Sequence, residues 1–205
     1  MEIHHPRHNS LINPGVFELY CGPMKSGKTG QLLLRLKVLD YARIYDYMLF
    51  KPAVDTRTSD VTSRMGISRE CIALNEKNPE GLLERVNGST RVVAIDEIQF
   101  FDSGIEKVIA QFVQRDINVL AAGLDLDFRG EPFGRMPNLL CMADRVYKIV
   151  GACDYKGCEE FSTRTQRLID GKPASYHSPI IVIDGQKREK YECRCLRHHE
   201  IKDKP

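Results

Sequence analysis

Short apolar runs alternate with longer amphipathic stretches between residues 16 and 150 of the chain. The apolar runs favour strands, whereas apolar residues at helical spacing, such as Leu32, Leu33 and Leu36, favour a helix. The pattern therefore predicts strands over residues 16–21, 47–51, 91–96, 117–123 and 145–150, and helices over residues 28–44, 79–87 and 104–115.

Near-continuous apolar runs indicate how these strands pack. Residues 92–95 read Val-Val-Ala-Ile and offer no polar side chain to solvent. Strands of this kind are buried on both faces, which is typical of a parallel sheet between layers of helices. We therefore expect an α/β fold. The polar residues 52–70 are expected to form a loop.

The character of the sequence changes near Gly151, where Cys, Lys, Glu and Arg replace the apolar periodicity. The length of 205 residues suits one full domain with a small appendage. We predict a flexible N-terminus over residues 1–14, an α/β domain over residues 15–150, a small C-terminal domain over residues 151–200 and a tail over residues 201–205.

The composition and net charge of the chain bear on whether it binds nucleic acid or a membrane. The chain has 30 Lys and Arg against 28 Asp and Glu, a net charge of +2. This small excess gives no reason to expect nucleic acid or an anionic membrane as a partner. No apolar stretch approaches the length of a membrane span, and the polar start lacks the apolar core of a signal peptide. We expect a cytoplasmic protein.

Residues 22–29 match the phosphate-binding pattern G-x-x-x-x-G-K-[ST] at every fixed position, between a predicted strand and a predicted helix. In such a loop, backbone N–H groups surround a triphosphate, the lysine contacts the β- and γ-phosphates, and the hydroxyl ligates Mg²⁺. We therefore expect an ATP site made by Gly22, Pro23, Met24, Lys25, Ser26, Gly27, Lys28 and Thr29.

The apolar run at residues 92–95 leads directly into Asp96 and Glu97. These acids stand at the carboxyl end of a predicted strand, where open α/β sheets bind ligands. Asp96 is expected to hold Mg²⁺ together with Thr29. Glu97 is the candidate general base for the group that attacks the γ-phosphate.

Other nucleotide-binding classes stay open at this point. Residues 96–99 also match the D-E-x-Q box of helicases, although a helicase normally closes its ATP site between two sheet domains and this chain has residues for one. A GTP-binding switch lacks support because residues 75–78 only superficially echo the guanine-reading N-K-x-D segment. A non-catalytic nucleotide sensor or a zinc-binding interaction module is a further alternative.

Seven cysteines are present, and Cys153, Cys158, Cys193 and Cys195 lie in the last quarter of the chain. An odd total in a chain without a secretion signal favours a metal site over a disulfide framework. The remaining three lie in or beside apolar runs and are expected to be small buried residues; they are Cys21, Cys71 and Cys141.

Four motifs in order resemble the thymidine kinases of the cytosolic, tetrameric type (type II). The phosphate loop fits G-P-M-[FY]-S-G-K-[ST] with Lys25 in place of the aromatic residue. D-E-[AGI]-Q-F-[FL] fits residues 96–101, G-L-D-x-x-F-x-x-x-P-F fits residues 123–133, and T-Q-R-L fits residues 165–168. The resemblance covers about residues 15–198.

This resemblance implies a P-loop (RecA-like) parallel sheet followed by a small zinc-binding lasso domain. It implies a homotetramer that uses ATP to phosphorylate the 5′-hydroxyl of thymidine, and of deoxyuridine, in pyrimidine deoxynucleotide salvage for DNA synthesis. Gln99 would join the ATP site. The residues implied for the nucleoside are Met24, Arg57, Phe100, Leu124, Phe128, Phe133, Thr165, Ile181, Ile183 and Tyr191, with Asp55 and Arg64 as further candidates near the sugar or phosphate.

The resemblance also implies a structural Zn²⁺ on Cys153, Cys158, Cys195 and His198, a thiolate and imidazole set that suits a closed tetrahedral site. The first pair is spaced C-x-x-x-x-C, two residues longer than the family's C-x-x-C, so this site departs from the pattern. Cys193 would be the spare thiol, and His199 is the alternative to His198. An exposed strand at residues 180–183 would need a nucleoside or a neighbouring subunit to cover it.

Overall fold

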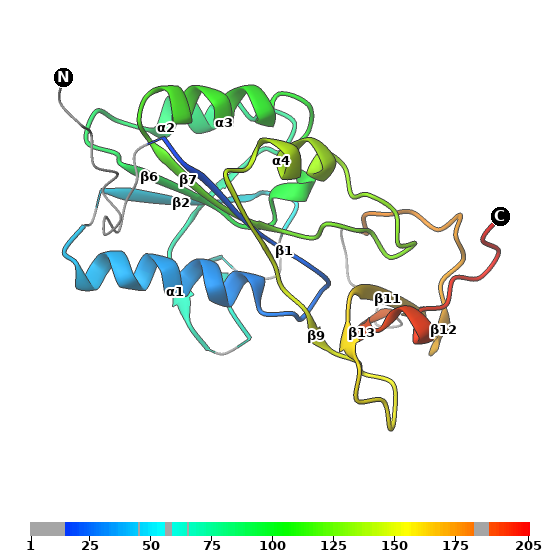
Figure 1. The fold of residues 1–205 in the computed structure, drawn as a ribbon. Helices are drawn as coiled ribbons and strands as arrows, with labels where there is room; N and C mark the ends of the chain where they lie inside the picture. The colour runs from blue at the N-terminus through cyan, green and yellow to red at the C-terminus, as the bar shows by residue number, and fades with distance from the viewer. Residues whose placement is uncertain (1–14, 45, 56–58, 65, 183–188) are drawn as a thin grey trace, which may run out of the picture.

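The computed structural model describes residues 15–44, 46–55, 59–64, 66–182 and 189–205. Within these residues, six strands form an all-parallel sheet in the order β5-β2-β6-β7-β1-β8 (Figure 1). The expected α/β fold with a central parallel sheet is confirmed. The strands are β1 (Phe17–Cys21), β2 (Tyr47–Pro52), β5 (Ile72–Leu74), β6 (Val92–Ile95), β7 (Asn118–Gly123) and β8 (Arg145–Lys148).

Helices cover both faces of this sheet. Helix α1 (Lys28–Tyr41) lies on one face, and α2 (Gly81–Arg85), α3 (Ile105–Gln114) and α4 (Met136–Met142) lie on the other (Figure 1). Each face has its own apolar core, one built around the leucines of α1 and one around the apolar side of α3. Every residue of β1, β6 and β7 is buried, as their apolar runs predict.

The sequence did not predict α4, β5 or the structure in residues 52–70. Helix α4 is seven residues long and β5 is three, so neither shows a hydrophobic period. The expected loop at residues 52–70 contains a hairpin of β3 (Val61–Thr62) and β4 (Ser68–Arg69). Its strands are two residues each, too short for an alternating pattern.

The C-terminal part is built from antiparallel strands, although its sequence has little periodicity. Strands β9 (Gly151–Ala152) and β10 (Phe161–Ser162) pair with each other. Strands β11 (Arg164–Ile169), β12 (Lys172–Pro173) and β13 (Glu189–Arg194) form a sheet in the order β12-β11-β13. A 3₁₀ turn, η2 (Leu196–His198), follows β13. This part lies beyond one end of the parallel sheet (Figure 1).

The register of β1, β6 and β7 determines which segments lie next to one another at that end of the sheet. Cys21 pairs with Gly123 at the carboxyl ends of β1 and β7, and Ile95 of β6 pairs with Ala121. The segments that follow these three strands therefore leave the sheet at the same edge, beside the C-terminal part. Among the described residues, no helix combines the length and apolar character needed to cross a membrane.

The three cysteines expected to be buried differ in exposure. Cys21 is fully buried in β1, Cys71 is half-buried, and Cys141 is exposed on α4. The expectation was wrong for Cys141, because the short helix that carries it turns this position to solvent.

Candidate active site

The loop from Gly22 to Thr29 connects β1 to α1 and requires glycine at its first position. Gly22 has φ +143°, and a Cβ there would lie 2.0 Å from the carbonyl oxygen of Ile149. Gly27, with φ +94°, is the N-cap of α1. The loop therefore ends at the positive end of a helix dipole, where free backbone N–H groups favour an anion.

Lys28 is buried at the first position of α1, and its Nζ donates a hydrogen bond to the carbonyl oxygen of Pro23 at 2.6 Å. Burial lowers the pKa of Lys28, while the nearby carboxylates of Glu97 and Asp96 act in the opposite direction. The ammonium group is thus held inside the curve of the loop, as a lysine that contacts phosphate oxygens must be.

Thr29 and Asp96 meet across the site. Thr29 Oγ1 lies 3.2 Å from Oδ1 and 3.1 Å from Oδ2 of Asp96. Thr29 comes from the first turn of α1 and Asp96 directly follows β6. Hydroxyl, carboxylate and phosphate oxygens are the ligands that Mg²⁺ prefers, so this pair fits the predicted Mg²⁺ position.

The side chains of Glu97 and Gln99, which follow Asp96 in the sequence, are joined by a hydrogen bond. Glu97 has φ +51°, a left-handed conformation that is uncommon for a side chain of this size. Gln99 Nε2 donates to Glu97 Oε2 at 2.6 Å, and Gln99 Oε1 accepts a hydrogen bond from the backbone N–H of Leu124 at 3.0 Å. Gln99 is only 2% exposed. Gln99 thus bonds the Glu97 carboxylate from a buried position, and the ATP contact that the resemblance implied for it stays a prediction.

A cavity of about 360 Å³ brings these groups together with the hairpin. Residues 24–29 of the phosphate loop line it together with Asp96, Glu97 and Leu124. Met24 and Leu124 are two of the residues predicted for the nucleoside. Arg64 and Asp55, the further candidates, also line it. Five lining residues were not predicted from the sequence. Gly30 follows the phosphate-loop motif on α1, and the other four belong to a polar run that has no distinguishing pattern; they are Asp60, Val61, Thr62 and Ser63.

Other residues predicted for the nucleoside lie outside this cavity. Phe100 and Phe133 pack edge to face at 5.5 Å and join the apolar core. Thr165 contacts the phosphate loop, since its Oγ1 accepts a hydrogen bond from the Met24 N–H at 2.9 Å. Ile181 is 43% exposed and its segment is not a strand in the described residues 180–182. Arg57 and Ile183 lie outside the described residues.

Phe128 and Tyr191 share Arg167 as a partner, a residue of the T-Q-R-L motif for which the sequence predicted no role. The Arg167 guanidinium lies 5.3 Å from the Phe128 ring centroid and 6.0 Å from that of Tyr191. Arg167 is 2% exposed, pairs with Glu189 and donates a hydrogen bond to the carbonyl oxygen of Pro179. A buried arginine with these contacts fixes the positions of both rings.

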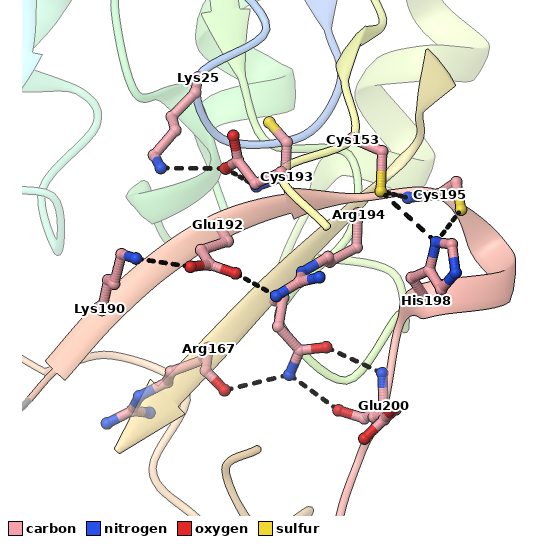
Figure 2. Close-up of polar contacts among 12 residues, drawn as sticks. Lys25, Cys153, Arg167, Lys190, Glu192, Cys193, Arg194, Cys195, His198 and Glu200 are labelled. Atoms are coloured by element: carbon pink, nitrogen blue, oxygen red, sulfur yellow. Dashed lines mark hydrogen bonds and ion pairs between the residues drawn. The ribbon is translucent and has the colours of Figure 1, made fainter. Parts of the chain in front are cut away.

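Cys153, Cys158, Cys195 and His198 converge in the C-terminal part, and their ligand atoms all lie within 4.8 Å of one another. Figure 2 shows three of them, Cys153, Cys195 and His198. The Cys158 and Cys195 Sγ atoms are 3.9 Å apart, and Cys153 Sγ is 3.8 Å from His198 Nδ1. A tetrahedral zinc with Zn–S bonds of ~2.3 Å requires ligand separations of about 3.8 Å. The donor set and its spacing therefore fit Zn²⁺.

The surroundings of this cluster support metal binding. Burial raises the pKa of the Cys153 thiol, but N–H groups of Cys195 and Tyr155 and the His198 ring more than offset it and lower the pKa to about 6. The Tyr155 ring stacks on the His198 ring at 4.0 Å. The cysteine thiolate is the form that binds zinc.

The structure also decides between the alternatives for this cluster. The Cys158 N–H donates to the Tyr155 carbonyl oxygen at 2.9 Å, and this turn accommodates the two extra residues of the first pair. His199 lies outside the cluster because its Nε2 bonds the Phe128 carbonyl oxygen at 2.9 Å. The Cys193 thiol instead donates to the carbonyl oxygen of Met24.

The chain was compared with family models and with solved structures. The family model described as thymidine kinase matches residues 15–199. A solved structure of the Pif1 helicase from Candida albicans is similar at 18% sequence identity with a TM-score of 0.42, over 66% of this chain and 36% of the helicase chain. This chain thus spans little more than a third of the helicase. Because the family match covers nearly the whole chain, this protein belongs to the thymidine kinase family.

Proposed function

We propose that this protein phosphorylates the 5′-hydroxyl of thymidine, and also that of deoxyuridine, in the salvage of pyrimidine deoxynucleosides for DNA synthesis. The observation that carries the proposal is one cavity lined by Lys28, Thr29 and Asp96 on the phosphate side and also by Glu97 and Leu124. Phosphoryl transfer needs a bound triphosphate, a metal position and an acceptor beside a base, and this cavity offers residues for each.

The phosphate loop and its neighbours would bind ATP and Mg²⁺. Backbone N–H groups at the start of α1 favour the phosphates, and Lys28 exchanges its bond to Pro23 for a phosphate oxygen. Thr29 and Asp96 would hold Mg²⁺, which neutralises charge on the β- and γ-phosphate oxygens when it is bound.

Glu97 is the proposed general base. Its carboxylate lines the cavity and is oriented by Gln99. A carboxylate held in this way can accept the proton of the 5′-hydroxyl as that oxygen attacks the γ-phosphate. The neighbouring Asp96 carboxylate lies against Thr29, at the proposed Mg²⁺ position. Asp96 would therefore hold the metal, while Glu97 would accept the proton.

Met24 and Leu124 would form the apolar side of the nucleoside site, near the 5-methyl group of thymine. Thr165 adjoins them through its bond to Met24. We assign Tyr191 to the deoxyribose and Phe128 to the base. Both rings lie against the buried Arg167 guanidinium, which holds them near each other. Excluding water from this site would make the nucleoside the acceptor in place of solvent.

A structural Zn²⁺ is proposed for Cys153, Cys158, Cys195 and His198. All seven cysteines are free thiols, which suits a reducing compartment such as the cytoplasm. We also propose a homotetramer. Supporting this, β8 is an outer strand of the sheet whose four residues are all exposed, including Val146 at 43% and Tyr147 at 42%. An exposed apolar edge strand normally requires cover.

The test is a radiolabelled-ATP assay across thymidine, deoxyuridine, deoxycytidine and deoxyguanosine. We expect labelled monophosphate from thymidine and deoxyuridine and little from the other two. A parallel reaction with DNA and no nucleoside measures ATP hydrolysis. DNA-stimulated hydrolysis without nucleoside phosphorylation would contradict the proposal and favour a nucleic-acid motor.

A further inference from the structure

The phosphate loop and the Cys-His cluster are joined by an ion pair that the reaction itself does not require. Lys25 Nζ, in the phosphate loop, lies 3.1 Å from Oδ2 of Asp154. The dashed line that starts at Lys25 in Figure 2 marks this ion pair. Asp154 directly follows Cys153 in the sequence. The phosphate loop is therefore joined by an ion pair to the segment that carries Cys153, one of the proposed zinc ligands.

Asp154 is fixed from the cluster side by two backbone bonds. Its Oδ2 accepts a hydrogen bond from the Cys193 N–H at 2.8 Å, and its own N–H donates to the Cys193 carbonyl oxygen at 2.8 Å. Two residues later, the Cys195 N–H donates to Cys153 Sγ at 3.3 Å. A metal bound by Cys153 and Cys195 would hold the segments around these two residues together and keep the Asp154 carboxylate directed at Lys25.

The phosphate loop has a conformation that needs such support. Lys25 has φ +64°, a left-handed conformation that is unfavourable for a residue with a side chain. Next to it, the Met24 N–H donates to Thr165 Oγ1, and the Met24 carbonyl oxygen accepts from the Cys193 thiol. Met24 and Lys25 thus make three polar contacts with the C-terminal part, to Thr165, Cys193 and Asp154.

From these contacts we infer that Lys25 and Asp154 are positioning residues that couple metal binding in the Cys-His cluster to nucleotide binding in the phosphate loop. Metal binding orders Asp154, the ion pair holds Lys25, and the loop is preformed for the triphosphate. By linkage, a bound nucleotide must tighten metal binding by the same factor. The inference rests on the proposed ATP and zinc sites and adds a connection between them.

The variants separate this role from direct contact with phosphate. Asp154→Asn removes the charge but keeps an oxygen that can accept from the Cys193 N–H. Lys25→Met removes the ammonium group and keeps most of the stem. Lys190→Met is the matched control, because Lys190 pairs with Glu192 at 2.7 Å on β13 without contacting the phosphate loop.

The first measurement is the dissociation constant of a non-hydrolysable ATP analogue for metal-loaded protein. The pair is partly exposed, with side chains 27% and 38% accessible, so a modest effect is expected. Asp154→Asn and Lys25→Met should each weaken binding about two- to fivefold, and the double variant should be no weaker than either. Lys190→Met should bind as wild type. Weakening by Lys25→Met alone would mean direct contact with phosphate and would overturn the inference.

The second measurement is competition for Zn²⁺ between the protein and a chromophoric chelator, with and without the analogue. Nucleotide should tighten zinc binding severalfold in wild type and in Lys190→Met, and not in Asp154→Asn or Lys25→Met. An equal nucleotide effect in wild type and Asp154→Asn, or no effect in wild type, would overturn the coupling while thymidine phosphorylation stood. A protein that bound no nucleotide would overturn both proposals.

Discussion

Gln99 holds the carboxylate of Glu97 in place. Its amide Nε2 donates to Glu97 Oε2 at 2.6 Å, while its Oε1 accepts the backbone N–H of Leu124 at 3.0 Å. One buried side chain therefore connects the proposed general base to the start of the segment after β7. The position of Glu97 depends on this connection because its own backbone is in the left-handed region.

Replacing Gln99 by Leu should lower turnover by roughly 10- to 100-fold, since the base loses its orientation. It should also lower the free energy of unfolding by about 1–3 kcal/mol, because the buried Leu124 N–H loses its acceptor. Gln99→Glu is the comparison: it keeps an acceptor for Leu124 but places a second carboxylate against Glu97. Steady-state kinetics and urea unfolding measure the two effects. Unchanged turnover in Gln99→Leu would remove the orienting role.

Replacing Glu97 by Gln should reduce turnover by about 10²- to 10⁴-fold, because an amide cannot accept the proton of the 5′-hydroxyl. Thymidine affinity, measured by calorimetry, should change little, since the shape of the side chain is kept. Glu84→Gln, at an exposed position of α2, is the control and should retain full activity. A Glu97→Gln protein with near-normal turnover would exclude Glu97 as the base.

Thr29→Val should raise the Mg²⁺ concentration needed for half-maximal rate by about tenfold, because the hydroxyl beside Asp96 is lost. Thr29→Ser keeps the hydroxyl and should behave nearly as wild type. The rate is measured against Mg²⁺ at saturating ATP. Equal Mg²⁺ requirements in the two variants would show that the hydroxyl does not serve the metal.

Removing the metal should weaken thymidine binding and lower the unfolding temperature by several degrees, because metal binding energy contributes to folding. Native mass spectrometry should find about one zinc per chain in wild type and none in Cys195→Ser. Cys141→Ser is the matched control, since Cys141 is an exposed thiol on α4 outside the cluster. Full zinc content in Cys195→Ser would refute the ligand set.

Glu106 links α3 to the start of α4, and this contact predicts a pH dependence of stability. Burial acts to raise the pKa of Glu106, but hydrogen bonds from Asn138 at 2.8 Å and from Arg135 at 2.6 Å outweigh it and hold the pKa below its usual value. The stabilisation is therefore complete above the unfolded-state pKa of about 4.3 and is lost as the pH falls through the lower folded-state value.

Glu106→Gln should therefore lower the free energy of unfolding at neutral pH by about 1 kcal/mol, and the difference from wild type should shrink in acid. Urea unfolding across the acid range measures this. Glu70→Gln, at an exposed position, should leave the pH profile unchanged. A difference that grew in acid would contradict the assigned contact.

Local patterns predicted much of the fold and the phosphate half of the site. Five strands and three helices of the α/β part were found at or near their predicted positions, because buried strands and amphipathic helices leave a period in the sequence. The loop at residues 22–29 and the acids after β6 were recognisable because their spacing along the chain is itself the requirement for binding phosphate.

Long-range contacts decided the rest. The hairpin that carries Arg64 into the cavity and the three-stranded sheet around Arg167 consist partly of strands of two residues, which leave no period. Phe133 and Phe100 lie in the core, which residue type alone could not distinguish from a position facing a base.

The sequence by itself determined the phosphate loop, the acids that follow the strand at Asp96, and the cysteines and histidines available for a metal. Each of these motifs, and each pair of metal-ligand candidates, consists of residues close together in the sequence. Only the tertiary structure chose His198 over His199, set Gln99 behind Glu97 and bonded Lys25 to Asp154. Each of these three outcomes depends on which segments lie side by side at the end of the parallel sheet. That arrangement follows only from the packing of the whole chain.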